Sequence, residues 1–308
     1  MRKVIGIGET ILDIIFKNEQ PYAAIPGGSV FNGMISLRRM GIPVSFISEV
    51  GQDHVGDMIL KCMEDNELST DYIDRFQQGK SPVSLAFLSK NNNASYSFYK
   101  EYPDQRLEVP APPINEDDII VFGSYYSLNP LLRSKTLEVL DIARQNKAII
   151  YYDPNFRKAH ANEAIHLTPT VLENLEYSDI VRGSDEDFYN LFHATDTEKV
   201  YHDHIEFYCK RFIETRGAGG VNLFTNLCKK HYDTPSLLPV STIGAGDNFN
   251  AGIVYGMLKN NVRYRDLPSI SQEVWDKIIK CGIDFATDVC MHTDNYVSKE
   301  FASNYNHY

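Results

Sequence analysis

Residues 240–252, VSTIGAGDNFNAG, place a glycine-rich turn directly before a helical pattern. Gly244 and Gly246 lack a Cβ, so the backbone N–H groups around them and Ala245 can converge on an anion at the start of the helix. Asp247 lies at the mouth of that anion site. A carboxylate there would repel a phosphate, but it could take a proton from an attacking hydroxyl, which indicates phosphoryl transfer. The alternative is an aspartate that only caps the helix.

The Gly-Ala-Gly-Asp turn resembles the C-terminal signature of the ribokinase-type (PfkB) carbohydrate kinases. Residues 26–32 (PGGSVFN), 37–41 (LRRMG) and 50–57 (VGQDHVGD) resemble a second signature of that family, with its elements in the same order. Two separated signatures are far rarer by chance than one. The resemblance runs from residue 4 to about residue 290, and it implies a ribokinase-like fold with ATP and Mg²⁺ as cofactors.

Composition excludes several other classes of protein. The chain has 308 residues, 43% of them hydrophobic, which is enough for a substantial core. Its formal net charge of -11 argues against nucleic acid as a partner. Five cysteines without a C-x-x-C pair are typical of a reducing compartment. Because we find neither a signal peptide nor an apolar run of about 18 residues, we expect a cytoplasmic protein without a membrane partner.

Short apolar runs alternate with longer amphipathic ones along the chain. The expected strands are residues 4–8, 44–50, 118–123, 148–153 and 179–182. The expected helices are residues 32–40, 55–65, 130–146, 185–192, 247–259 and 272–290. This alternation predicts an α/β fold with a doubly wound, mainly parallel sheet flanked by helices.

Two segments break the alternation. Residues 11–16 with 22–25, and 83–89 with 95–100 across an asparagine turn at 91–93, indicate antiparallel strands without intervening helices. In the resembled family these segments form a small β lid over the sugar. We therefore expect one domain, residues 1–308, with the lid as two excursions at about 11–26 and 83–107. The resemblance also makes a homodimer through the lid a candidate assembly.

The resemblance assigns sugar binding to four residues near the N-terminus. Asp13 offers two acceptor oxygens, which suit neighbouring hydroxyl groups, although it could instead cap a loop. Gly27 and Gly28 offer backbone N–H groups with no side chain in the way. Asn32 can both donate to and accept from a hydroxyl, and its alternative is a helix N-cap.

A further element follows the expected strand 148–153. Residues 153–157, DPNFR, resemble the Asp-x-Asn-x-Arg element of fructokinases and 2-keto-3-deoxygluconate kinases. Asn155 would contact the sugar, and Arg157 would steady the transferring phosphoryl group with its fork of donors. The alternative is a surface turn with a solvated arginine. Ligands of open α/β sheets collect at the carboxyl ends of strands, which favours a functional role.

The nucleotide site is expected later in the chain. Residues 215–220, TRGAGG, follow an expected strand at 211–214 and resemble the family's Thr-x-Gly-x-x-Gly loop. Thr215, Gly217 and Gly220 would let ATP lie against the backbone, although a glycine-rich β-turn has the same pattern.

The metal-orienting element departs from the family pattern. Where the family has Asn-x-x-Glu, this chain has Ser184 and Asp187, with Glu186 as a substitute carboxylate. We expect these oxygens to act on Mg²⁺ through water. Ser241 stands where potassium-activated members have an aspartate, so we expect little dependence on a monovalent cation.

These features predict an ATP-dependent kinase that phosphorylates a primary hydroxyl of a small sugar, with fructose as the first choice. Kinases of 2-keto-3-deoxygluconate typically present Tyr-x-Arg in the lid, whereas this chain has Phe98 and Lys100 there as substrate-binding candidates. That keto acid and a nucleoside remain alternative substrates. A catalytically silent sugar- or nucleotide-binding regulator on the same scaffold is the non-enzyme alternative.

Overall fold

The computed structural model describes residues 2–88 and 94–305, and the asparagine turn expected at 91–93 lies outside these ranges. In the described part, nine strands form one sheet in the order β13-β12-β11-β10-β9-β8-β1-β4-β5. From the first edge, their bounds are β13 Lys229–Tyr232, β12 Val221–Phe224, β11 Phe212–Thr215, β10 Ile180–Ser184, β9 Ile149–Asp153, β8 Ile119–Gly123, β1 Val4–Ile7, β4 Val44–Gly51 and β5 Ile73–Phe76. Pairing is parallel from β11 to β5, and β11–β12 and β12–β13 pair antiparallel.

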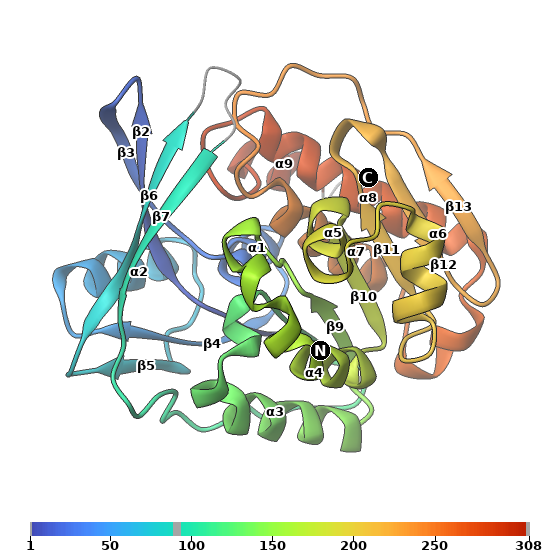
Figure 1. Cartoon of the computed structure of the whole chain (residues 1–308), viewed down its shortest axis with the longest axis horizontal. Coiled ribbons are helices and arrows are strands. Elements are labelled where there is room, and N and C mark those ends of the chain that lie inside the picture. Colours follow the sequence, from blue (N-terminus) through green and yellow to red (C-terminus); the bar gives the residue numbers. More distant parts are fainter. Residues whose placement is uncertain (1, 89–93, 306–308) are drawn as a thin grey trace.

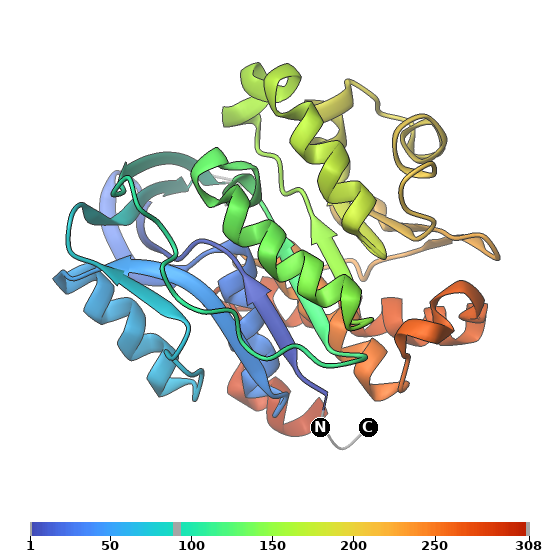
Figure 2. The same cartoon turned by 90° about the horizontal axis from the view of Figure 1, so that it is seen from below.

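Helices cover both faces of this sheet (Figures 1 and 2). One face carries α1, α7 and α8, and the other carries α3, α4 and α5. The helix bounds are α1 Ser29–Arg39, α2 His54–Asp65, α3 Arg133–Gln145, α4 Ala164–Tyr177, α5 Asp185–Phe192, α6 Thr197–Val200, α7 Ala245–Lys259, α8 Gln272–Cys290 and α9 Lys299–Tyr305. Each face of the sheet has its own hydrophobic core, and alternate residues of a strand point into one core or the other. Val4 belongs to the core with α1 and α7, and Ile5 belongs to the core with α3. No helix of the described ranges is long and apolar enough to cross a bilayer.

A second sheet stands apart from the first, in the order β3-β2-β6-β7, and projects beside the body in Figure 1. Its strands are β2 Ile11–Lys17, β3 Gln20–Gly27, β6 Lys80–Leu88 and β7 Ala94–Glu101. β2 pairs antiparallel with β3 and parallel with β6, and β6 pairs antiparallel with β7. We call this four-stranded sheet the lid. The predicted doubly wound sheet and small separate lid are therefore confirmed, while the division of the chain into domains stays a prediction.

Several boundaries differ from the sequence-based expectation. The helix expected at 32–40 begins at Ser29, because Gly28 supplies the N-cap at φ 135°. The helix expected from residue 130 begins as a short 3₁₀ turn, Pro130–Leu132, before α3. α4 was not predicted, since Pro169 interrupts its helical pattern. β5, β12 and β13 were also missed, because strands of four residues carry little periodic signal.

Candidate active site

The stretch 240–252 contains a turn that ends at Gly244 and the first eight residues of α7, which begins at Ala245. Gly244 is the N-cap at φ 79°, a left-handed conformation that favours glycine, and no side chain caps this helix. Asp247 is the third residue of α7, and its Oδ2 accepts a hydrogen bond of 2.8 Å from Nδ2 of Asn32 in α1. The helix-cap interpretation of Asp247 is therefore wrong, since its carboxylate points to a residue of another helix.

Asn248 holds the turn in place through hydrogen bonds to three other residues. The amide nitrogen of Asn248 donates to the carbonyl oxygens of Gly244 at 2.7 Å and Asn295 at 2.8 Å. Its amide oxygen accepts from the hydroxyl of Ser36 in α1. Asn248 is completely buried. These three bonds hold the turn against α1 and the segment after α8, so its amides are oriented before any ligand binds.

The carboxylate of Asp247 is buried and has an altered acidity. Burial raises its pKa to about 6, against the opposing effects of the Asn32 hydrogen bond and the positive charge of Arg157. Asp153 adds a negative charge that raises the pKa further, and Arg182 lowers it. A carboxyl with a pKa near 6 is ionised at neutral pH and still accepts a proton more readily than an exposed aspartate, as a general base must.

The sugar-binding candidates gather beside Asp247. Asp13 lies in β2 and is buried, with Oδ1 accepting from the hydroxyl of Ser84 in β6. Its Oδ2 lies 2.7 Å from the position that a Cβ on Gly27 would take, and Oδ1 of Asn32 lies 3.6 Å from the same point. Burial raises the pKa of Asp13 to about 6. The structure thus brings Asp13, Gly27 and Asn32 together, with Asp13 in a strand rather than capping a loop.

Gly28 and Asn32 occupy the start of α1. The carbonyl oxygen of Glu9 would lie 2.1 Å from a Cβ on Gly28, so only glycine fits between β1 and this helix. Asn32 is in the first turn of α1 and does not cap it, so the N-cap interpretation fails. Its Oδ1 is buried and has no hydrogen-bond partner among the described residues. A buried acceptor left open at a site is suited to a ligand hydroxyl.

The lid candidates lie farther out on β7. The side chain of Phe98 is 41% exposed, and the Nζ of Lys100 lies 5.1 Å from the centre of its ring. Lys100 also forms an ion pair of 2.7 Å with Glu9, which follows β1. The structure therefore anchors Lys100 to the body of the protein instead of leaving it directed only at a substrate.

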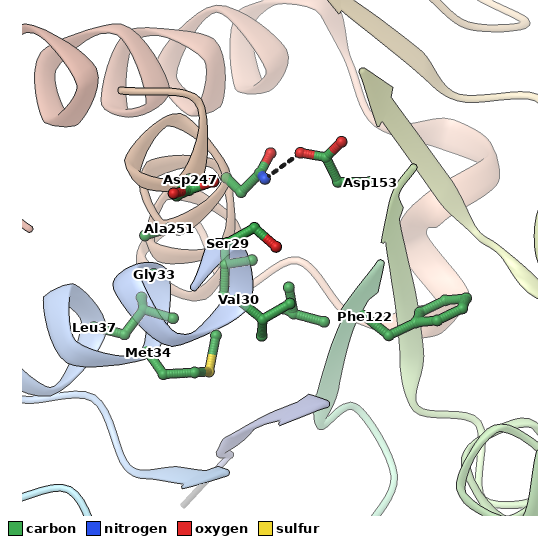
Figure 3. Close-up of a pocket in the computed structure, with 12 residues that line it drawn as sticks. Ser29, Val30, Gly33, Met34, Leu37, Phe122, Asp153, Asp247 and Ala251 are labelled. Carbon is green, nitrogen blue, oxygen red and sulfur yellow. Dashed lines mark hydrogen bonds between the residues drawn. The ribbon is translucent and has the colours of Figure 1, made fainter. Parts of the chain in front are cut away.

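The carboxyl end of β9 carries the Asp-Pro-Asn-Phe-Arg element. Asn155 is buried at φ 39°, and its backbone N–H donates to Oδ1 of Asp153 at 2.9 Å. Arg157 is exposed, yet its charge lowers the pKa of both Asp247 and Asp187. Asp153 and Asp247 line the same pocket (Figure 3). The interpretation of this element as a solvated surface turn therefore does not hold for its buried residues.

Arg182 connects the carboxyl end of β9 to Thr215, the first residue of the expected nucleotide loop. It is buried in the middle of β10, where Nη1 bonds Oδ2 of Asp153 at 2.7 Å and Nη2 donates to the hydroxyl oxygen of Thr215. Beyond Thr215 the chain turns at Gly217 (φ 53°) and Gly220 (φ 88°). A Cβ on Gly217 would meet open space, so the loop leaves room for a ligand beside its backbone.

The metal candidates lie at the start of α5. Ser184 and Asp187 form a capping box: the Ser184 hydroxyl accepts from the Asp187 N–H, and Oδ2 of Asp187 accepts from the Ser184 N–H at 2.7 Å. Oδ1 of Asp187 is buried and has no hydrogen-bond partner within the described ranges. Glu186 is exposed. No group of three histidine, cysteine or acidic side chains forms a direct metal cage in the part of the chain that the structure describes.

Sequence reasoning quoted Asp153 only as part of the DPNFR element, and it gave no role to Arg182, Asn250 or Asn295. Asp153 and Asn250 are joined by a hydrogen bond of 2.6 Å from the amide, drawn as the dashed line in Figure 3. The side-chain amide of Asn295 is buried, has no partner among the described residues, and lies 3.2 Å from a Cβ position on Gly27. Only the spacing of Asn250, one helical turn after Asp247, could have signalled its role.

Curated relatives of this chain include fructokinases and a riboside kinase. The chain is 28% identical over 267 residues to a fructokinase from Rhizobium leguminosarum bv. trifolii, covering 84% of this chain and 81% of the relative. It is 23% identical over 264 residues to an aminoimidazole riboside kinase from Salmonella typhimurium, covering 85% and 82%.

Solved structures share the fold at low sequence identity. A double mutant of the fructokinase from Vibrio cholerae, with fructose, ADP and potassium bound, superposes with a TM-score of 0.84 at 19% identity, covering 96% of this chain and 94% of that one. The aminoimidazole riboside kinase from Salmonella enterica, with its riboside and an ATP analogue, gives 0.81 at 19% identity, covering 99% of both chains. The pfkB family carbohydrate kinase model matches residues 1–272, and the chain belongs to this family.

Proposed function

We propose that this chain transfers the γ-phosphoryl group of ATP to a primary hydroxyl of a small sugar, and that Asp247 is the general base. The observation that carries the proposal is the position of Asp247: a buried carboxylate with a pKa near 6, two residues into the helix that follows the glycine turn. Asn32 orients it with a hydrogen bond of 2.8 Å. A base at the anion site matches the need to deprotonate a hydroxyl as it attacks a phosphoryl group.

The other residues have roles that follow from their positions. Amides of Gly244, Ala245 and Gly246 stabilise negative charge on the transferring group, since they lie at the start of α7. Arg157 is exposed, its charge acts on Asp247, and it supplies a positive charge to the same group. Asp13 and the open Oδ1 of Asn32 hold the sugar hydroxyls beside Asp247. The lid limits access of water that would otherwise hydrolyse ATP.

The donor set near α5 fits Mg²⁺ held through water. Oδ1 of Asp187 is an open buried acceptor, whereas its Oδ2 is occupied by the capping box with Ser184. One free carboxylate oxygen is too few for direct octahedral coordination, but it can orient a metal-bound water. When bound, Mg²⁺ would neutralise charge on the nucleotide phosphates. Because Glu186 is exposed, Asp187 is the better candidate of the two.

Fructose is the proposed substrate. Fructokinases are prominent among the relatives, and a relative of the same fold binds fructose and ADP. The contact of Lys100 with Glu9 adds an argument from this chain itself. Lys100 is already paired, and Glu9 places a negative charge at that end of the lid, so a keto acid's carboxylate would meet a compensated cation and a repelling anion.

A coupled assay of ADP release with Mg-ATP tests this proposal across fructose, 2-keto-3-deoxygluconate, ribose, tagatose and adenosine. We expect fructose to give the highest kcat/KM. Faster turnover of the keto acid would overturn the choice of substrate and leave the phosphoryl-transfer chemistry in place. Fastest turnover of adenosine would favour a nucleoside kinase, which the relationship to a riboside kinase makes the second candidate. No turnover of any of them would favour a binding regulator.

We also propose that the chain forms a homodimer through its lid. Large aromatic side chains are exposed on three lid strands: Tyr22 is 58% exposed, Phe87 39% and Tyr99 61%. Exposed aromatic groups gathered on one small sheet are typical of a surface that another chain covers. Light scattering after size exclusion should give a mass of about two chains. A Tyr99→Glu variant should be a monomer with an unchanged melting temperature, and a monomeric parent protein would contradict the proposal.

A further inference from the structure

Arg182 is a buried charge that neither the family motifs nor the proposed mechanism uses. It lies in the middle of β10, and only 4% of its surface is exposed. A guanidinium in such a place destabilises a fold unless it is paired and hydrogen-bonded. Its two terminal nitrogens bond Oδ2 of Asp153 at 2.7 Å and the hydroxyl of Thr215. Arg182 thereby connects the last residues of β9 and β11 through β10, at the edge where the site lies.

The same guanidinium supports the glycine turn. A Cβ placed on Gly246 would lie only 3.2 Å from both terminal nitrogens of Arg182, so the guanidinium packs directly against this residue. Its partner Asp153 is also held by α7, because the amide nitrogen of Asn250 donates to Oδ2 of Asp153 at 2.6 Å. Asn250 is in turn fixed by the hydroxyl of Tyr151 at 2.8 Å. The Arg182–Asp153 pair thus ties the first turn of α7 to the sheet.

Charges of both signs face Asp247 across this space. Asp153 from β9 raises the pKa of Asp247, while Arg157 after β9 and Arg182 from β10 lower it. From α1 the facing group is the neutral amide of Asn32. Asp187 of α5 is buried nearby, and its own pKa is raised by burial and by Asp153. Several carboxylates therefore share one buried region, and Arg182 is bonded directly to one of them, Asp153.

We propose that Arg182 is a positioning residue for phosphoryl transfer, which holds Asp153 and Thr215 under the glycine turn and offsets the charge of Asp153 so that Asp247 stays ionised. This inference deepens the proposed function and rests on it, since it takes Asp247 as the base. Arg182 acts through Asp153 and the turn, and it needs no contact with the sugar.

The Arg182–Asp153 pair could act only by holding the structure in place, or also through its charges, and these two roles predict different pH profiles for the variants. If the pair were only a brace, Arg182→Gln and Asp153→Asn would break the same bond and have similar consequences. If charge matters, removing the arginine leaves Asp153 uncompensated and makes Asp247 harder to ionise. Removing the Asp153 charge has the opposite effect. The acidic limb of the pH profile of kcat/KM contains the ionisation of the base in the free enzyme, together with that of Asp13, whose pKa burial also raises to about 6. Arg182 and Asp153 are not among the groups that shift the pKa of Asp13, so movement of the limb between variants at these positions reports on Asp247.

The experiment measures this acidic limb for the parent protein, Arg182→Gln, Asp153→Asn and Arg182→Lys, with Mg-ATP and the best sugar of the substrate panel. We expect the limb to move up by about one pH unit in Arg182→Gln and down in Asp153→Asn. Arg182→Lys keeps the charge, so its limb stays near that of the parent, while kcat falls because an ammonium cannot bond both partners in the same geometry. Limbs that move in the same direction, or that do not move, would overturn the proposal.

Two controls make the result specific. Arg211→Gln removes an arginine at the opposite end of β11, where its Nε donates to the Asp179 carbonyl at 2.7 Å, and its limb should match that of the parent. A melting curve identifies any variant that does not fold; if Arg182→Gln is one, the direction of the Asp153→Asn shift still decides. Should Asp247→Asn keep full activity, the proposed base itself is wrong. Should it be inactive while the limbs move together, only the role of Arg182 fails.

Discussion

The catalytic edge of the large sheet and the lid are built in opposite ways. At the catalytic edge the charged side chains are buried and bonded to one another: Asp153, Arg182 and Asp247 are each at most 7% exposed. In the lid, large side chains face solvent, and Tyr22 and Tyr99 are more than half exposed. The residues that we propose for phosphoryl transfer are thus buried in the body, and the buried Asp13 of β2 belongs to the same site, whereas large aromatic side chains elsewhere in the lid face solvent.

The lid is attached to the body through a compact group of charges at its base. Glu9 accepts from the ammonium of Lys100 at 2.7 Å and from the hydroxyl of Tyr102 at 2.6 Å. Arg106, in the segment after β7, bonds the buried Glu49 of β4 through Nε at 2.8 Å and stacks on the ring of Tyr102. We call these five residues the lid base.

The largest effect is expected at the catalytic edge. Asp247→Asn keeps the shape and the bond from Asn32 but removes the base, so kcat should fall by roughly 10²- to 10⁴-fold. Affinities for sugar and ATP should change little, because their other contacts remain. Steady-state rates together with calorimetric binding check this. A variant with near-full kcat, while chemistry limits the rate, would show that Asp247 is not the base.

The lid base should matter for stability more than for chemistry. Glu49→Gln leaves the buried guanidinium of Arg106 without its anion, since both side chains of this pair are at most 2% exposed. Breaking one partner of a buried pair costs about 3–5 kcal/mol in the free energy of unfolding. Urea denaturation measures it. The exposed Arg75–Asp57 pair is the matched control, and Asp57→Asn should cost less than about 1 kcal/mol. Equal losses would contradict the difference between the regions.

A smaller effect is expected on the free energy of unfolding, because the ionised carboxylate of Asp247 is buried in the folded protein. The unfolded carboxyl of Asp247 titrates near 3.9, and the folded one titrates at about 6. The native protein therefore binds an extra proton between these values, and this contribution to stability is lost as pH rises through 6. Asp247→Asn should be more stable than the parent by about 1–3 kcal/mol at pH 8, with the gain shrinking towards pH 4. Denaturation at both pH values tests this, and a variant less stable at pH 8 would contradict it.

The smallest effect is expected from potassium. The hydroxyl oxygen of Ser241 accepts a hydrogen bond of 3.2 Å from the N–H of Ile243 and carries no charge, so it attracts a hydrated cation weakly. Initial rates in potassium and tetramethylammonium buffers of equal ionic strength should differ less than tenfold, about 1.4 kcal/mol. Ser241→Asp should increase the dependence. A tenfold or larger rise with potassium in the parent would show that another ligand replaces the carboxylate.

The sequence predicted the parts of the fold and site that rest on local patterns. Strands and helices with clear periodicity were located to within a few residues, and α5 and α8 were predicted with their observed bounds. The hydrogen bond between Asn32 and Asp247 was not predicted, because 215 residues separate them in the chain. Local pattern says nothing about which distant side chains will meet.

Arg182 and Asn295 show why the rest could not be predicted. An arginine after a short apolar run is usually solvated, and only the parallel neighbours β9 and β11 provide the partners that let it be buried. Asn295 lies in an irregular segment after α8, where no periodicity marks a buried position. Gly252 is the converse case, a residue of a functional signature whose position is explained by packing. It belongs to the quoted signature, yet a Cβ there would lie 2.4 Å from the Cys281 carbonyl oxygen, so it serves the packing of α7 on α8.

The most direct test of the account follows the phosphoryl group itself. In a single-turnover experiment, excess protein is mixed with Mg-ATP labelled in the γ-phosphoryl group and with saturating fructose, and the products are separated over time. The account predicts that the label moves to the sugar as a phosphate ester in the parent and stays in ATP over the same period in Asp247→Asn. Label released as inorganic phosphate, or transferred equally fast by the variant, would contradict it.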